Sequence, residues 1–193
     1  MSKTKPLEDI QEAYEAGQRD FGENYVQELL QKVEQMPRDV RWHMIGNLQS
    51  NKAAQMAKLV NDGYLVTLQT VDSLKLAQKL DRALTKPMDV FIEVHTSQEE
   101  TKSGCSVGEV VQLFNEIKEL KNLNFKGLMT IGDPSSHEKT VECFKIMQEL
   151  QKQTGGLLSM GMSADWEVAT QHGANVVRIG SAIFGNRVYP KKE

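Results

Sequence analysis

Two lysines near the start of the chain are the first residues whose types and spacing suggest chemistry. Lys3 and Lys5 lie in the segment SKTKP (2–6). A lysine that forms a Schiff base with an aldehyde must first lose its proton, so burial or a cationic neighbour has to lower its pKa. Lys5 would supply part of that repulsion to Lys3. Lysines at a terminus are more often solvated on a frayed end, so the chemical interpretation needs support from other segments.

Two later segments have the features of an anion site. In SMGMSADWEVA (159–169) a strand is expected to end just before Ser163 and a helix to begin two residues after it. Backbone N–H groups at a helix start bind phosphate readily together with a hydroxyl, although Ser163 would also serve as a simple helix cap. RIGSAIFG (178–185) places Gly180 and Ser181 after the last expected strand, where a glycine backbone can approach a ligand closely.

Other polar residues at expected strand ends have structural explanations that compete with ligand binding. Arg178 needs a partner if it is buried, and the ring nitrogen of a heterocycle would serve. Asn24 in FGENY (21–25) is at least as well explained as a cap of the next helix. His43 is expected to face the interior as a hydrogen-bonded core histidine, and Lys102 to be solvated. No Ser/His/Asp triad, metal-ligand cluster or pair of coupled carboxylates emerges.

The composition indicates one soluble domain. The chain has 193 residues, 39% of them hydrophobic, and a net charge of -3 from 23 basic and 26 acidic residues. One domain over residues 1–193 is therefore expected, with no clustered basic surface for nucleic acid. No apolar run approaches the roughly 18 residues of a membrane span. Cys105 and Cys143 have no metal spacing and are expected to be free thiols, which favours a cytoplasmic location.

Helical and extended patterns alternate along the chain. The first helix follows Pro6 and ends at Gly17, and Asp72 is expected to cap a helix after the third strand. Ser106 and Glu109 form the sequence pattern of a capping box. DVFIEVHT (89–96) is apolar and β-branched, as expected of a strand buried on both faces. Seven strands are expected, at 19–22, 42–46, 64–69, 89–96, 125–131, 157–162 and 175–180.

This alternation predicts a parallel sheet with right-handed crossovers. An open doubly wound sheet should carry a glycine-rich turn after an early strand, and the sequence has none. A (β/α)8 TIM barrel explains the regular spacing better, but it needs eight strands. We therefore expect the missing strand in front of residue 1, with Ser2 and Lys3 at its carboxyl end. In such barrels the loops after the last two strands commonly bind phosphate, and here these loops hold Ser163 and Gly180.

Six segments, spread in order over the whole chain, resemble the pyridoxal phosphate homeostasis proteins, whose barrel is of the alanine racemase N-terminal type. This resemblance implies a single (β/α)8 barrel that binds pyridoxal 5′-phosphate (PLP) and lacks the second domain of the racemases. It also implies that the first helix and most of the first strand are missing from this chain. The segments are SKTKP (2–6), FGENYVQEL (21–29), WHMIGNLQSNK (42–52), GLMTI (127–131), LSMGMSADWE (158–167) and VVRIGSAIFG (176–185).

The resemblance also assigns roles to particular residues. Lys3 matches the lysine that forms the internal aldimine with PLP, and Lys5 a second lysine thought to help in transfer or secondary binding. Arg178 matches the arginine that faces the pyridine nitrogen, and Asn24 an asparagine near the cofactor. The phosphate-binding positions are matched by Ser163, Gly180 and Ser181.

The implied function is to hold PLP and deliver it to apo-enzymes within the cell, without racemase activity. An arginine at the ring nitrogen disfavours ring protonation and so weakens PLP as an electron sink. The resemblance further implies a cytoplasmic monomer, with a mitochondrial pool as an alternative location. The competing hypotheses are a PLP-dependent racemase or lyase, a shortened form that no longer binds PLP, and, more remotely, a barrel aldolase with a Schiff-base lysine.

Overall fold

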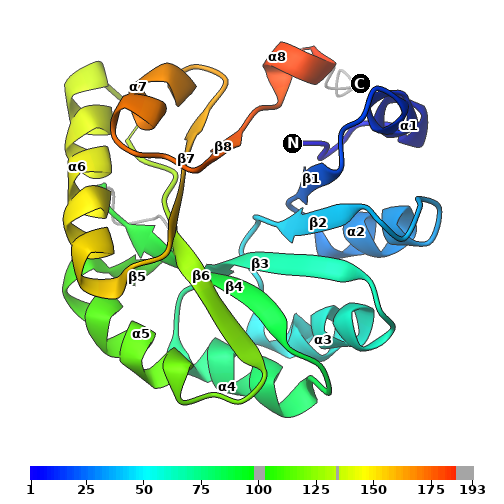
Figure 1. The fold of residues 1–193 in the computed structure, drawn as a ribbon, viewed down its shortest axis with the longest axis horizontal. Helices are drawn as coiled ribbons and strands as arrows, with labels where there is room; N and C mark the ends of the chain where they lie inside the picture. The colour runs from blue at the N-terminus through cyan, green and yellow to red at the C-terminus, as the bar shows by residue number, and fades with distance from the viewer. Residues whose placement is uncertain (98–102, 134, 186–193) are drawn as a thin grey trace, which may run out of the picture.

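The computed structural model describes residues 1–97, 103–133 and 135–185. Within these residues one parallel sheet curls around the centre of the molecule, and helices cover its outer side (Figure 1). The strands of its main path are β1 (Asp20–Glu23), β2 (Arg41–Met44), β3 (Leu65–Val71), β4 (Met88–His95), β6 (Leu123–Met129), β7 (Leu157–Met162) and β8 (Val176–Arg178).

The strand order follows the sequence, because each strand pairs in parallel with the next one along the path. This is the order of a (β/α)8 barrel, so the predicted fold class is confirmed. All seven predicted strands are present, with ends shifted by a few residues. An eighth strand, β5 (Cys105–Ser106), was not predicted; it pairs with β4 off the main path and is only two residues long.

Helices follow the strands as the periodicity predicts. The capping box of Ser106 and Glu109 is confirmed at the start of η2. The predicted cap at Asp72 is wrong: Ser73 precedes the helix, and its hydroxyl accepts the Leu76 N–H. The helices are α1 (Leu7–Glu15), α2 (Val26–Val33), η1 (Ser50–Lys52), α3 (Ala53–Asn61), α4 (Leu74–Ala83), η2 (Val107–Glu109), α5 (Val110–Lys118), α6 (His137–Thr154), α7 (Trp166–Gln171) and α8 (Ser181–Phe184).

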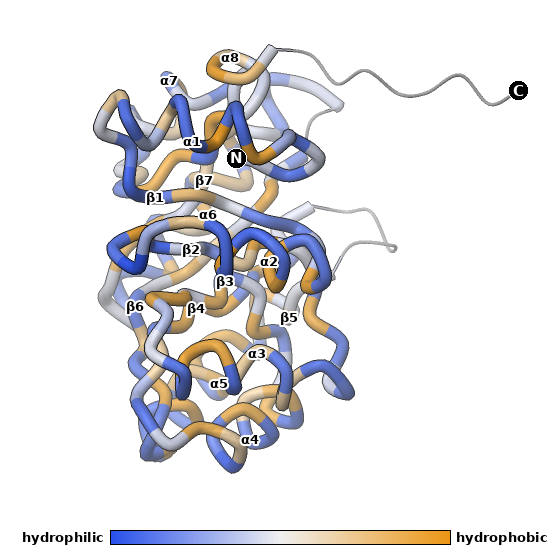
Figure 2. Tube along the Cα trace, turned by 90° about the vertical axis from the view of Figure 1, so that its right-hand side faces the viewer, coloured by the Kyte–Doolittle hydropathy of each residue, from blue (hydrophilic) through white to orange (hydrophobic). Residues whose placement is uncertain are grey.

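The main core lies between the sheet and the helices. On β4, Val90, Ile92 and Val94 are buried in this core, as expected of a strand that is covered on both faces. A second, smaller cluster joins Phe91 to Ile45, Met129 and the partly buried Met1. In Figure 2, hydrophobic segments run along the strands and inner helix turns, while hydrophilic segments lie mostly at the periphery. Most buried strand residues are apolar, but a few polar side chains, among them Gln69, Glu93 and Ser159, are buried within the strands.

The sheet has two ends, β1 and β8, which are not paired with each other in the part of the chain that the structure describes. The start of the chain lies between them (Figure 1). The Met1 amine donates to the carbonyl of Ile179 at 2.6 Å, and the Ser2 N–H donates to the carbonyl of Gly22 at 2.9 Å. The first two residues therefore bridge the carboxyl ends of β1 and β8, where Lys3 enters the mouth of the barrel.

Candidate functional site

A cavity of about 430 Å³ opens at the carboxyl ends of the strands. In (β/α)8 barrels this is the face on which sites are built. The structure brings all seven predicted site residues together in this cavity, although they come from the start, the first quarter and the end of the chain. The lining residues are Met1, Lys3, Lys5, Asn24, Ile45, Ile131, Met162, Ser163, Ala164, Arg178, Gly180, Ser181 and Gly185.

One corner of the cavity is built from the turns after β7 and β8. The Gly180 N–H donates to the Ser163 hydroxyl at 3.2 Å, which ties the two turns together. Gly180 precedes α8, whose first residue is Ser181. The first N–H groups of a helix have no carbonyl one turn earlier to bond, so they are available to an anion. The alternative role of Ser163 as a helix cap is wrong, because Asp165 occupies the position before α7.

Arg178 forms the floor of the cavity. It is 6% exposed, and its guanidinium donates to Ser159 Oγ at 3.1 Å and to the carbonyl of Thr130 at 2.7 Å. Burial lowers the pKa of Arg178 to about 10, against the opposing effects of Asp165 and Glu93. The side chain therefore remains a cationic hydrogen-bond donor at neutral pH.

The hydrogen bonds behind Arg178 continue across the barrel interior. Ser159 Oγ donates to Gln69 Oε1 at 2.6 Å, and Gln69 Nε2 lies 3.0 Å from Nδ1 of His43. The other ring nitrogen of His43 contacts Asp20 at 3.2 Å. The predicted hydrogen bonding of His43 is thus confirmed, although its side chain is 19% exposed and lies outside the core clusters. His43 lies behind the floor of the cavity and is absent from its lining.

Asn24 follows β1 and lines the cavity. Its predicted role as a helix cap is wrong, because Tyr25 is the residue that precedes α2. The side-chain Oδ1 of Asn24 is buried without a hydrogen-bond partner among the described residues. The backbone of Asn24 packs closely against Gly46, because any larger residue at position 46 would place its Cβ 2.0 Å from the carbonyl oxygen of Asn24.

The segment that carries the two lysines is held firmly at its start. Ser2 is fully buried, and its hydroxyl donates to Glu23 Oε1 at 2.6 Å. The expectation of a frayed end with solvated lysines is therefore wrong for this structure. Lys3 lines the cavity, and the Lys5 ammonium donates to the carbonyl of Phe184 at the end of α8. This contact joins the lysine segment to the opposite wall.

These groups fit the chemistry of PLP, the cofactor that the resemblance implies. A lysine amine suits its aldehyde, and the hydroxyl and N–H groups around Ser163 and Gly180 suit its phosphate. The guanidinium of Arg178 is a donor for a ring nitrogen. The orphaned Oδ1 of Asn24 marks a buried polar atom that a ligand can satisfy. The cavity volume also lies in the usual range of small-molecule sites.

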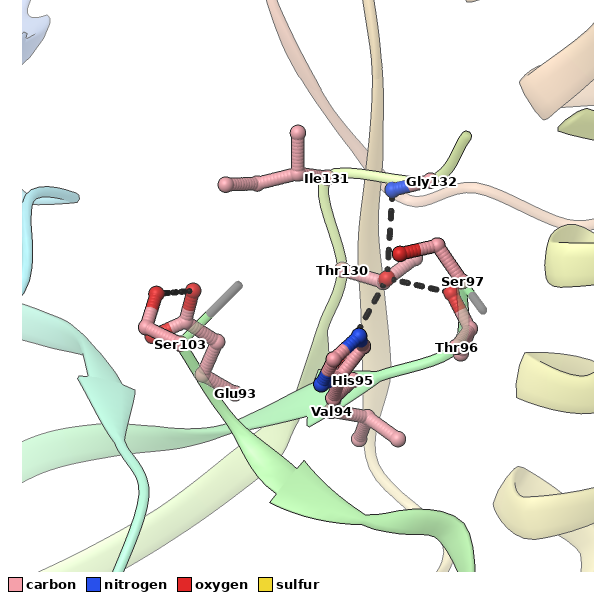
Figure 3. A pocket seen from close by; sticks show the side chains of 9 residues that line it. All are labelled: Glu93, Val94, His95, Thr96, Ser97, Ser103, Thr130, Ile131 and Gly132. Carbon is pink, nitrogen blue, oxygen red and sulfur yellow. Dashed lines mark hydrogen bonds between the residues drawn. The ribbon is translucent and has the colours of Figure 1, made fainter. Parts of the chain in front are cut away.

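A second, much smaller hollow of about 10 Å³ adjoins the cavity and shares Ile131 with it (Figure 3). Glu93 lies in its wall, 2% exposed, and accepts a hydrogen bond from the Ser103 hydroxyl at 2.8 Å. Burial raises the pKa of Glu93 to about 7, opposed by the Ser103 hydrogen bond and by Arg178. The second carboxylate oxygen of Glu93 and Nε2 of His95 are buried without a partner in the described part of the chain.

Sequence reasoning missed two groups of residues here. Ile45, Ile131 and Met162 give the cavity its apolar walls, and nothing in their residue type separates them from core residues. Glu93 had a signal, because it is a carboxylate in the otherwise apolar segment 89–96. This carboxylate alone did not identify a site, because the sequence of one strand does not show which face of the sheet points towards a cavity.

Several other kinds of site find no support in the described residues. Residues 1–97, 103–133 and 135–185 contain no group of three His, Cys, Asp or Glu side chains arranged for a metal ion. No helix in these ranges combines the length and hydropathy needed to cross a bilayer. Both cysteines are free, as predicted, and both are buried; burial raises the pKa of Cys105 to about 12. The predicted solvation of Lys102 lies outside the described residues.

Comparison with known proteins places these features in a family. The sequence model of the alanine racemase N-terminal domain matches residues 5–188. A pyridoxal phosphate homeostasis protein of Schizosaccharomyces pombe is 43% identical over 195 residues, covering 97% of this chain and 82% of that protein. The protein of the same name from Escherichia coli is 39% identical, with coverage of 100% and 86%.

Solved structures agree with the sequence comparison. PipY of Synechococcus elongatus is 34% identical and superimposes with a TM-score of 0.85 without PLP and 0.82 with PLP bound. Each superposition covers 95% of this chain and 90% of PipY. The strand order, the family model and the sequence identity to these relatives agree. The chain therefore belongs to the pyridoxal phosphate homeostasis protein family, which is built on the alanine racemase N-terminal domain fold.

Proposed function

We propose that this protein binds PLP in the cavity at the carboxyl ends of its strands and acts in intracellular PLP homeostasis. The single observation that carries this proposal is that one cavity is lined by the Lys3 amine, by the guanidinium of Arg178 and by the turns that hold Ser163 and Gly180, which we call the phosphate corner. The homeostasis names of its relatives and the PLP bound to PipY support it. We extend the proposal to delivery: the protein holds PLP as an aldimine of Lys3 and passes it to apo-enzymes as a cytoplasmic monomer.

The residues of the chain divide the work of binding. The Lys3 amine is the nucleophile for the aldehyde carbon, and one water leaves when the imine forms. Ser163, Gly180 and Ser181 bind the phosphate through the two serine hydroxyls and through backbone N–H groups. Arg178 remains protonated and donates toward the ring nitrogen, which keeps this nitrogen an acceptor. Asn24 contributes the amide oxygen that has no partner within the described structure.

The same arrangement argues against racemisation or lyase chemistry at this site. Bound PLP would supply an electron sink for such reactions, and that sink is strong only when the ring nitrogen is protonated. The Arg178 donor opposes this protonation. Racemisation also needs a second acid or base opposite Lys3. Among the described residues that line the cavity, the titratable groups are the Met1 amine and the side chains of Lys3, Lys5 and Arg178. The Met1 amine donates to the carbonyl of Ile179 and the Lys5 ammonium to the carbonyl of Phe184.

The test is a visible-absorbance titration with PLP, followed by borohydride reduction and peptide mapping. We expect saturable binding and one reduced adduct on the peptide that contains Lys3. In Lys3→Ala this adduct should be absent, whereas Lys5→Ala should retain it. An unsaturable signal, or adducts scattered over surface lysines in both the parent protein and Lys3→Ala, would refute the proposed function.

A further inference from the structure

Three charged side chains lie directly behind the segment that carries Lys3. The Lys32 ammonium on α2 donates to the backbone carbonyl of Ser2 at 2.9 Å. It also contacts Glu23 Oε1 at 2.8 Å and Glu28 Oε1 at 2.5 Å. Lys32 is 6% exposed and Glu23 is fully buried. We call Glu23, Glu28 and Lys32 the anchor cluster.

The anchor cluster bonds the chain on both sides of Lys3. On one side, Ser2 donates through its hydroxyl to Glu23 and accepts through its carbonyl from Lys32. On the other side, the backbone N–H of Thr4 donates to Glu28 Oε1 at 2.6 Å. The backbone of Lys3 is therefore fixed between two hydrogen-bonded residues, each of which is bound to the same cluster.

Thr4 provides an independent sign that this conformation is imposed. Its φ is 63°, and it is the one non-glycine residue with a positive φ in the part of the chain that the structure describes. β-branched residues seldom adopt this conformation, and it persists only when surrounding contacts hold it. The contacts that hold it here are the bond from the Thr4 N–H to Glu28 and the turn closed by the Lys5 N–H on the Ser2 carbonyl.

Stability alone does not account for a buried cluster of this kind. Taking a lysine and a carboxylate out of water carries a large desolvation cost, and well-packed apolar residues often serve as well or better. Burial raises the pKa of Glu23, and the hydrogen bonds from Lys32 and Ser2 oppose this rise. The cluster directs these bonds at the lysine segment.

We propose that Lys32, oriented by Glu23 and Glu28, is a positioning residue that holds the backbone of Lys3 so that its amine meets the aldehyde of the cofactor. This inference rests on the proposed function, because it takes Lys3 to be the residue that reacts. It adds a role that the phosphate corner and Arg178 do not have: they bind the ligand, whereas Lys32 acts on the nucleophile.

The inference is testable with two ligands that differ only at the reacting carbon. Pyridoxine 5′-phosphate carries an alcohol in place of the aldehyde of PLP, so it fills the same cavity without forming an imine. In Lys32→Met we expect PLP affinity to fall about tenfold or more, as for loss of hydrogen bonds from a charged group. The affinity for pyridoxine 5′-phosphate should stay within about twofold, because its contacts are unchanged.

The matched control is Lys58→Met. Lys58 on α3 also forms an (i, i+4) ion pair, with Asp62 directly after this helix, but its side chain is 73% exposed and it does not line the cavity. This variant should bind both ligands as the parent protein does. Equal loss of both ligands in Lys32→Met would mean a general collapse of the pocket, and unchanged PLP binding would mean that Lys3 needs no anchor; either result overturns the inference.

A second pair of variants decides the question if Lys32→Met does not fold, as judged by circular dichroism. Glu28→Gln retains an oxygen acceptor for the Thr4 N–H, whereas Glu28→Ala removes it. We expect the borohydride-trapped Lys3 adduct to survive in Glu28→Gln and to fall several-fold in Glu28→Ala. Equal trapping in both overturns the inference. Absence of a trapped Lys3 adduct in the parent protein would instead refute the proposed function, so the two failures are distinguishable.

Discussion

The two sides of the cavity are built on different physical principles. The phosphate side consists of turns that continue directly from β7 and β8, so the barrel itself fixes Ser163 and Gly180. The lysine side is a short segment between the sheet ends, and side-chain charges on β1 and α2 fix its path. The geometry of the phosphate side should therefore survive substitutions far from it. The position of the lysine segment should instead change when Glu23, Glu28 or Lys32 is removed. Ligand capture and covalent attachment should therefore be separable by mutation.

The largest effect is expected on the phosphate side. Replacing both Ser163 and Ser181 with alanine removes two hydroxyl donors to a charged phosphate. Hydrogen bonds to charged groups contribute about 1.5–3 kcal/mol each, so the double variant should lose about 3–6 kcal/mol of binding free energy. The loss should be the same for PLP and for pyridoxine 5′-phosphate, in contrast to Lys32→Met. Titration calorimetry with both ligands measures it, and a loss confined to PLP would contradict the division between the two sides.

The next effect concerns Glu93, which belongs to neither side of the cavity and lies in the wall of the small hollow (Figure 3). Its pKa is raised by burial from 4.5 to about 7, so the folded protein holds this proton more tightly than the unfolded chain does. Between these two pH values the folded state binds more protons. The free energy of unfolding should therefore fall as the pH rises through this window, by about 3 kcal/mol in total.

Glu93→Gln tests this dependence, because an amide retains an acceptor for the Ser103 hydroxyl without the charge. We expect the variant to match the parent protein near pH 4.5 and to be more stable at pH 8. Urea unfolding at the two pH values measures the difference. If the parent protein and the variant respond equally to pH, Glu93 is not the group that titrates.

The smallest effect is expected for Lys5→Ala. Lys5 contributes one partly buried hydrogen bond, to the carbonyl of Phe184 at the end of α8. This bond joins two parts of the protein and does not contact PLP, so PLP affinity should fall by less than about tenfold. The Lys3 adduct should persist. PLP transfer is measured as the rate at which an apo-enzyme recovers its activity. If Lys5 helps in transfer, this rate should change by a larger factor than the PLP affinity does. If Lys5 only ties α8 to the lysine segment, the rate should be unchanged.

Much of the fold was predictable from the sequence because local patterns decide it. The alternation of strands and helices follows from side-chain periodicity, which is a property of each segment. The errors occurred where two neighbouring residues compete for one local role. Asp72 and Ser73 are both good helix caps, and only the chain direction at the start of α4 selects Ser73. Asn24 and Ser163 likewise have cap-forming side chains, yet both lie one or two positions before the actual cap.

The amino-acid sequence alone is enough to predict the parallel barrel and seven of the residues that line its mouth. Barrel topology brings strand ends together wherever they lie in the chain, so residues after different strands converge without further information. The family motifs then identified Lys3, Ser163 and Arg178 among them.

How Lys3 is held, by contrast, follows from tertiary packing. Glu28 and Lys32 form an (i, i+4) pair that, in sequence, is indistinguishable from an ordinary surface ion pair such as that of Lys58 and Asp62. The fold buries the Lys32 ammonium and gives it the carbonyl of Ser2 as an additional partner, thirty residues away. The physical reason is that burial and long-range hydrogen bonds depend on which elements pack together, and no local pattern encodes that packing.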